Sequence, residues 1–176
     1  MSIPKTGVVR EYWNNNNLKH EYFMVDNKIE GLHRSFYRDS QLCIATQYVN
    51  GLKHGIQYQY YRNGNLEAIN YYIDNIQQGV RRVYENDGSL LSVYSANNFI
   101  KHGPFVSYYP NGQIEKKCSY FNDVLHGPYR EYYDDGETKI ACQYINGGLN
   151  GVCKSYNVRG KKKETRRRYD DDDIYG

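Results

Sequence analysis

Apolar and polar positions alternate along this chain in a pattern that recurs every 24 residues. Each repeat opens on a glycine, which we number position 0. An aromatic residue stands at position 5, an aliphatic residue usually at position 11, and most often a tyrosine at position 17. The opening glycines are Gly7, Gly31, Gly55, Gly79, Gly103, Gly127 and Gly151. Seven repeats, with no insertion or deletion between them, therefore cover most of the chain.

Each repeat predicts one β-hairpin. Tyrosine-rich segments such as residues 103–109 favour strands, and a pair such as Asn111-Gly112 favours a tight turn between two strands. A second turn, for example at residues 121–123, leads to the next repeat. No window has a helical period, so helix should be scarce. The sequence thus predicts an all-β fold, an elongated single-layer antiparallel sheet of seven stacked β-hairpins.

Strand alternation predicts which positions share a face. Positions 1, 3 and 5 have the same parity as positions 11, 13, 15 and 17, so we expect them to form one buried face. If the two turns centre near positions 8 and 21, Tyr60 pairs with Leu66 and Tyr72 with Val80. Such cross-strand pairs stabilise a sheet by roughly 0.2–1 kcal/mol each.

A second aromatic series at position 6 falls on the opposite face. It comprises Trp13, Tyr37, Tyr61, Tyr109 and Tyr133. A single-layer sheet cannot bury both faces well, so we expect this tyrosine-rich strip to be exposed and to bind a partner. The alternative is that the twist of the sheet and long side chains cover it.

The first strand has an apolar edge that invites pairing with a second copy of the chain. The hypothetical self-association edge comprises Val8, Val9, Tyr12 and Trp13. A homodimer through the first repeats is one interpretation, and coverage of the edge by residues 1–6 is the other.

The last strand is strongly basic. Its cations are Lys161, Lys162, Lys163, Arg166, Arg167 and Arg168. Lysine and arginine protect a terminal strand from pairing with other chains. The same residues could form a nuclear-localisation signal or a patch for anionic lipid or nucleic acid. Four aspartates at residues 170–173 offset much of the charge.

The cysteines predict free thiols. Cys118 and Cys142 occupy the same position in adjacent repeats, roughly 9.5 Å apart, which is beyond disulfide reach. Cys142 and Cys153 lie on neighbouring strands, but their parity predicts opposite faces. With Cys43, four free thiols and a reducing compartment are expected.

No cluster of residues suggests catalysis, a metal site or a cofactor. His54, His102 and His126 each precede an opening glycine, but their predicted spacing prevents one ion from contacting two of them. Asp134-Asp135 occupies a turn position that Asn111 fills one repeat earlier. We therefore predict no catalytic residue, no metal, no cofactor and no enzymatic activity.

Composition narrows the class of protein. The net charge is only +3, which argues against nucleic acid as a partner. The mean hydropathy of −0.88 argues against a membrane-spanning segment. No membrane-spanning run and no secretion signal are evident. We expect an intracellular, cytoplasmic location, with membrane-peripheral or nuclear targeting as alternatives. Abundant Asn, Ile, Lys and Tyr indicate an A/T-rich genome, such as that of a bacterium or a large DNA virus.

The pattern GxxxxYYxNGxxxxxxxYxNGxxHG resembles the MORN repeat in its variant form. The resemblance covers residues 7–169 and is clearest in 55–150, between an N-terminal tail of residues 1–6 and an acidic tail of residues 170–176. It implies a twisted sheet of hairpins of the kind used by scaffolds, dimerisation modules and membrane-associated organisers. The commoner form of the repeat has more glycine and tryptophan in its first strand, whereas this chain has tyrosine there and one tryptophan, Trp13.

Two functional hypotheses follow. The first is a non-enzymatic scaffold that presents a tyrosine-rich sheet face to a protein partner or to a second copy of itself. The second is peripheral association with anionic membranes through the basic C-terminal strand.

Overall fold

The computed structural model of the chain describes residues 6–157 and the strand at residues 162–167. The described residues form strands and turns, with no helix among them, and so none that could cross a membrane. The strands are β1 (Gly7–Tyr12), β2 (Leu18–Val25), β3 (Lys28–Phe36), β4 (Leu42–Val49), β5 (Leu52–Tyr60), β6 (Leu66–Ile73), β7 (Ile76–Tyr84), β8 (Leu90–Asn97), β9 (Ile100–Tyr108), β10 (Ile114–Phe121), β11 (Val124–Leu125), β12 (Gly127–Tyr132), β13 (Thr138–Ile145), β14 (Gly148–Leu149), β15 (Val152–Tyr156) and β16 (Lys162–Arg167).

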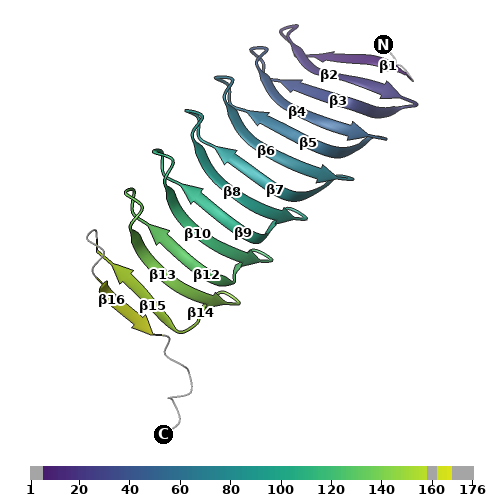
Figure 1. Cartoon of the computed structure of the whole chain (residues 1–176). Helices are drawn as coiled ribbons and strands as arrows, with labels where there is room; N and C mark the ends of the chain where they lie inside the picture. The colour runs from purple at the N-terminus through teal and green to yellow at the C-terminus, as the bar shows by residue number, and fades with distance from the viewer. Residues whose placement is uncertain (1–5, 158–161, 168–176) are drawn as a thin grey trace. The chain divides into compact units, whose positions relative to one another are not determined.

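The chain divides into two compact units, which are described separately. The N-terminal unit comprises Met1–Leu91 and Ser95–Phe99, and the C-terminal unit comprises Ser92–Tyr94 and Ile100–Gly176. Within each unit, successive strands form antiparallel hairpins, and each hairpin pairs with the next one along the chain (Figure 1). The predicted all-β antiparallel fold is confirmed.

One unpaired residue at position 12 reverses the faces of every second strand whose pairing is described. In the third repeat, Tyr60 pairs with Leu66 as predicted, but Gln59 pairs with Ala68, which leaves Glu67 as a one-residue β-bulge. Beyond the bulge, position 1 lies opposite position 16 and position 2 opposite position 15. The prediction that positions 1, 13, 15 and 17 share a face is therefore wrong, because one extra residue moves all later side chains to the other face.

The second turn is shorter than predicted. Asp74 and Asn75 have φ values of 49° and 69° and form a two-residue hairpin turn. The next strand consequently begins three residues before the opening glycine, and Tyr72 lies opposite Gln77. The predicted pair of Tyr72 with Val80 is wrong for this reason.

Four opening glycines, Gly31, Gly55, Gly79 and Gly103, lie inside strands β3, β5, β7 and β9, and the register shifts beside those whose pairing is described. Gly79 has a φ of 73° within β7, where the register of β6 and β7 shifts between Ile69 and Tyr72. A left-handed backbone inside a strand favours glycine, and such bulges re-aim the side chains that follow. Gly31, Gly55 and Gly79 are therefore bulge residues rather than the starts of strands, whereas Gly7 and Gly127 begin β1 and β12.

The core of the N-terminal unit lies on the face that carries positions 2, 4, 13, 15 and 17, called here the buried face. Its centre is polar: Thr46, Gln57, Asn70 and Gln77 are each only 3–5% exposed. Gln57 Nε2 donates to Thr46 Oγ1 (2.9 Å), Asn70 Nδ2 to Gln57 Oε1 (3.2 Å) and Gln77 Nε2 to Asn70 Oδ1 (2.9 Å). This polar ladder links β4, β5, β6 and β7. Its members satisfy one another, which makes their burial tolerable.

Candidate interaction surfaces

The aromatic residues at position 6 join each repeat to the next within a unit. Each ring donates a hydrogen bond to the backbone carbonyl at position 5 of the following repeat. The pairs are Trp13 Nε1 to Phe36 (3.2 Å), Tyr37 Oη to Tyr60 (2.7 Å), Tyr61 Oη to Tyr84 (2.9 Å), Tyr109 Oη to Tyr132 (2.8 Å) and Tyr133 Oη to Tyr156 (2.9 Å). All five rings are half-buried. The structure thus places the predicted partner-binding residues in contacts between repeats, and their binding to a partner stays a prediction.

Burial favours the protonated form of two of these hydroxyl groups, those of Tyr37 and Tyr61. It raises the pKa of Tyr37 to about 12, with Cys43 adding to the shift, and it also raises the pKa of Tyr61. Both groups are consequently neutral hydrogen-bond donors across the physiological range. Sequence reasoning identified the series but not its role, because the register that brings each ring to the next repeat depends on the bulges.

Amide side chains in the first turn of the third repeat also contact the following repeat. Asn63 and Asn65 both donate to the carbonyl of Asn86, at 2.8 and 2.9 Å. Asn63 Oδ1 also accepts from the Asn65 backbone N–H (3.0 Å), which closes an Asx turn. The carboxyl of Asp87 accepts the equivalent bond from Ser89 (2.8 Å). An Asn or Asp at position 8 is the sequence signal for this turn.

The face opposite the core of the N-terminal unit is apolar and exposed. It carries positions 1, 16 and 18 and the residue three before each opening glycine. We define the exposed apolar face as Val8, Phe23, Val25, Leu32, Val49, Leu52, Ile56, Tyr71, Ile73, Ile76 and Val80, each between 37% and 53% exposed. Sequence reasoning missed this surface, because it assigned the position 1 aliphatics to the core.

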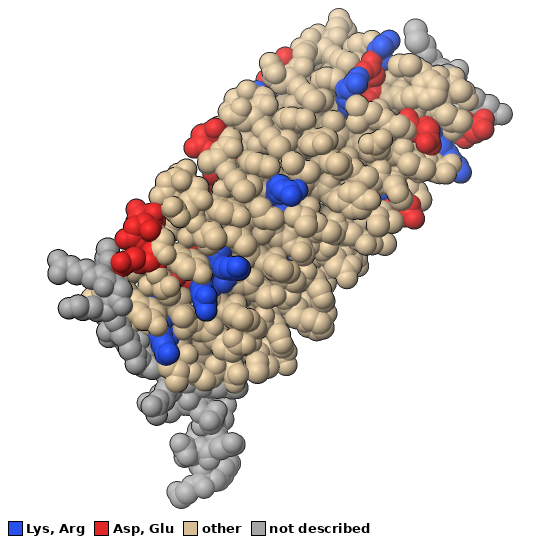
Figure 2. Space-filling model, viewed as in Figure 1, with Lys and Arg blue, Asp and Glu red and all other residues tan. Residues whose placement is uncertain are grey.

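Cross-strand pairing makes this surface regular. Val49 pairs with Leu52, and Ile73 with Ile76 one repeat later. Successive equivalents lie roughly 9.5 Å apart, since each repeat adds two strands to the sheet. The face of the molecule drawn in Figure 2 has few charged side chains, and its acidic residues gather toward the borders.

A small ion network lies at the N-terminal end of the same face. Glu21 accepts from Arg10 Nε (2.9 Å) and from Arg34 Nη1 (2.8 Å). The bond from Arg10 is the main cause of the lowered pKa of Glu21, and Arg34 adds to the effect. The network fixes charged side chains beside the apolar positions of the first two hairpins.

The predicted self-association edge is strand β1. It pairs with β2 on one side, and no strand among the described residues pairs with its other side. Val8 and Tyr12 are 53% and 57% exposed, Trp13 is half-buried, and Val9 points into the buried face at 7% exposure. The four residues therefore belong to three different environments, and dimerisation through them stays a prediction.

A histidine and three aromatic neighbours cluster on the buried face of the N-terminal unit. The His33 ring lies 5.3 Å from that of His20, 5.1 Å from that of Tyr22 and 5.7 Å from that of Tyr48. Its buried Nε2 has no hydrogen-bond partner among the described residues. Burial lowers the pKa of His33, and His20 lowers it further. The other histidines contact turns: His54 lies 3.2 Å from Asp74, and His102 lies 3.0 Å from Asn122.

The cysteines correct the prediction of four free thiols. Ala141 pairs with Lys154 between β13 and β15, so Cys142 lies directly opposite Cys153, with 4.3 Å between their Cα atoms. The two form a disulfide. Parity placed them on opposite faces because it took the second turn to centre on a residue. The turn has two residues, with Ile145 opposite Gly148, so residues of unlike parity lie on the same face. The free cysteines among the described residues are Cys43 and Cys118.

The basic run forms the last described strand. Within β16, Arg167 pairs with Val152 and Arg166 with Cys153 of β15. Lys161 and Arg168 lie outside the described residues, as do the side chains of the strand. The edge-protection, localisation and lipid hypotheses all remain predictions.

Three segments of the chain match a known protein family. Residues 53–74, 101–122 and 125–146 match the family model described as the MORN repeat variant. This confirms the resemblance inferred from the 24-residue pattern. A search of curated proteins finds no match. MORN repeats are generally associated with protein–protein or membrane-lipid interactions, and the repeat is a non-catalytic module.

Proposed function

We propose that this chain, a MORN-repeat protein of the variant type, is a non-enzymatic interaction module whose exposed apolar face binds protein, beginning with a second copy of itself. The observation that carries the proposal is the regular set of exposed aliphatic side chains on one face of the N-terminal unit. Contiguous apolar surface of this kind marks interaction sites on soluble proteins.

Burial of these side chains supplies the driving force. Each square ångström of apolar surface removed from water contributes about 25 cal/mol. A second copy offers the same spacing of about 9.5 Å per repeat, so several side chains can meet equivalent ones at once. A symmetric contact of one face with itself is also the commonest way in which soluble proteins form dimers.

The test is sedimentation equilibrium over a concentration series. Replacement of Ile56 and Ile73 by lysine places two charges on the exposed apolar face, where the side chains are 41% and 37% exposed. We expect the wild type to gain mass with concentration and the double variant to stay monomeric. The control is Ile114→Lys, which charges an isoleucine of similar exposure (36%) in the C-terminal unit. A wild type that is monomeric throughout would contradict self-association and direct attention to a different protein partner.

Anionic membrane association is the second candidate, favoured by the six cations within residues 161–168. Basic residues near an anionic surface contribute about 1 kcal/mol each. Co-sedimentation with neutral and anionic vesicles over a salt series, for the full chain and for residues 1–158, tests it. Salt-sensitive binding that is lost on truncation supports this function, and equal binding by both chains contradicts a role for the run.

A further inference from the structure

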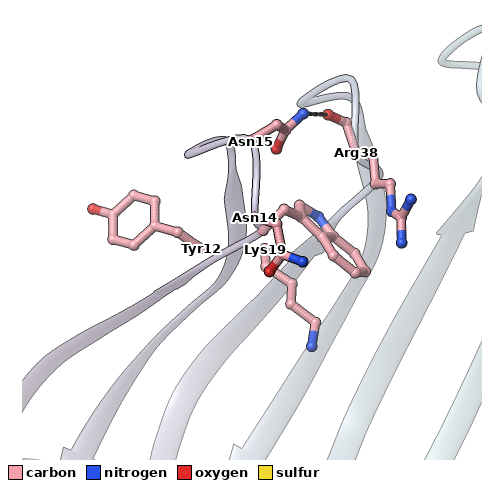
Figure 3. A pocket seen from close by; sticks show the side chains of 6 residues that line it. Tyr12, Asn14, Asn15, Lys19 and Arg38 are labelled. Carbon is pink, nitrogen blue, oxygen red and sulfur yellow. Dashed lines mark hydrogen bonds between the residues drawn. The ribbon is translucent and has the colours of Figure 1, made fainter.

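A hollow of about 350 Å³ lies at the first turn of the first repeat. Its lining comprises Tyr12, Trp13, Asn14, Asn15, Lys19 and Arg38 (Figure 3). The first five come from β1, β2 and their turn, and Arg38 comes from the turn after β3. The site therefore depends on the junction of two repeats.

The local fold brings two cations to one aromatic ring. Lys19 is the unpaired bulge residue of β2, and its Nζ lies 4.8 Å from the centre of the Trp13 ring. The Arg38 guanidinium carbon lies 5.4 Å from the same centre. The indole is fixed because its N–H donates to the Phe36 carbonyl (3.2 Å). Asn15 holds the Arg38 backbone through a bond of 3.0 Å to its carbonyl.

Charge distinguishes this hollow from its equivalents. Among the described residues, neither Lys19 nor Arg38 has a carboxylate within ion-pair distance. One repeat later, Arg62 lies over Tyr37 in the same way (5.3 Å) but pairs with Asp39 at 3.9 Å.

The corresponding hollow in the C-terminal unit includes an acid. It is lined by Tyr109, Pro110, Asn111, Tyr133 and Asp134. The first-repeat hollow has no acidic residue in its lining, so two positive charges stand there uncompensated.

We propose that this hollow binds a phosphate group. Lys19 and Arg38 supply charge-assisted donors, which are the strongest partners for phosphate oxygens. The Asn14 amide is exposed and makes no hydrogen bond among the described residues, so it is a third donor. Two positive charges match a phosphate dianion better than a single carboxylate. The proposal is independent of self-association, because no lining residue belongs to the substituted positions of that test.

The chain contains a single tryptophan, so its fluorescence reports on this site alone. We expect a saturable change in Trp13 emission when inorganic phosphate replaces chloride at constant ionic strength. Lys19→Gln and Arg38→Gln should each weaken phosphate binding by about tenfold, as the loss of a charge-assisted bond implies. Arg62→Gln is the matched control, since it removes the same charge one repeat away, and it should leave binding unchanged. Lys19→Arg, which keeps the charge, should retain it.

Several results would overturn the proposal. These are no saturable change with phosphate, an equal response to acetate, or equal weakening by Arg62→Gln. Two further titrations separate the sources of the phosphate group. A response to O-phosphoserine supports a soluble phosphomonoester. A response to phosphatidylcholine vesicles that contain phosphatidic acid, with none to O-phosphoserine, supports a lipid headgroup. Far-ultraviolet circular dichroism establishes that each variant has kept its fold.

Discussion

Removal of one tyrosine hydroxyl tests the contact that joins successive repeats. Tyr61 Oη donates to the Tyr84 carbonyl at 2.9 Å and so links the third repeat to the fourth. Tyr61→Phe removes this bond and keeps the ring. The matched control is Tyr60→Phe, which removes a hydroxyl from the neighbouring half-buried tyrosine. Among the described residues, that hydroxyl has no hydrogen-bond partner.

The magnitude follows from the geometry. A hydrogen bond of this kind contributes about 0.5–1.5 kcal/mol net. Tyr61 and Tyr84 are both half-buried, so water only partly replaces the hydrogen bond that the Tyr84 carbonyl loses. We expect Tyr61→Phe to lower the free energy of unfolding of the N-terminal unit by about 1 kcal/mol. The control should change it by less than about 0.5 kcal/mol.

Urea unfolding followed by circular dichroism measures the total loss. Native-state hydrogen exchange locates it, because stability in a repeat protein is a sum of repeat and interface contributions. Protection should fall for the amides of β6 and β7. Tyr133→Phe, in the C-terminal unit, should add its own loss without coupling to Tyr61→Phe. Equal losses for Tyr61→Phe and Tyr60→Phe would refute the reasoning, since the bond to Tyr84 would then contribute nothing measurable.

Three further predictions concern stability. Burial lowers the pKa of His33 below 6.5, so its neutral form stabilises the N-terminal unit above about pH 6.5 and this stabilisation is lost as the pH falls. The urea midpoint should therefore fall less between about pH 7 and about pH 5 in His33→Gln than in the wild type. An equal fall in both proteins would show that other groups, including His20, cause the loss of stability at low pH. Reduction of Cys142–Cys153 should destabilise the C-terminal unit by about 2–3 kcal/mol. Because Cys118 is buried, the thiols are counted in denaturant without a reductant, and two should be detected rather than four. Phe99 has a φ of 67° in a turn and is 60% exposed, so Phe99→Asn should raise stability by up to about 1 kcal/mol in thermal unfolding. A loss would show that the contact of its ring with that of Tyr72, 6.3 Å away, outweighs the backbone strain.

The hairpins were predictable because turn residues and strand residues recur together. The pairing of Tyr60 with Leu66 follows from the first turn alone, since the two residues are close in sequence. Glu67 could not be recognised as a bulge, because its side chain is ordinary for a strand and only the pairing reveals it. That bulge explains the misassigned core and the missed exposed apolar face. The unexpected disulfide follows from the two-residue second turn, in which Ile145 lies opposite Gly148.

Part of the lining of the Trp13 hollow could be predicted from the sequence. The position 6 series singled out Trp13, and Lys19 is close to it in the chain. Arg38 belongs to the next repeat, and its approach to the ring depends on the spacing of neighbouring hairpins. Sites between repeats require that register, which composition and parity do not supply.

The polar ladder has a thermodynamic consequence. Exposure of apolar groups raises the heat capacity on unfolding, whereas exposure of polar groups lowers it. Thr46, Gln57, Asn70 and Gln77 occupy the centre of the buried face, so the N-terminal unit should have a heat-capacity change below the usual ~12–15 cal/mol/K per residue. A small change flattens the dependence of folding free energy on temperature. The unit should therefore keep much of its stability on cooling, and its cold-denaturation temperature should lie far below that of a domain with an apolar core.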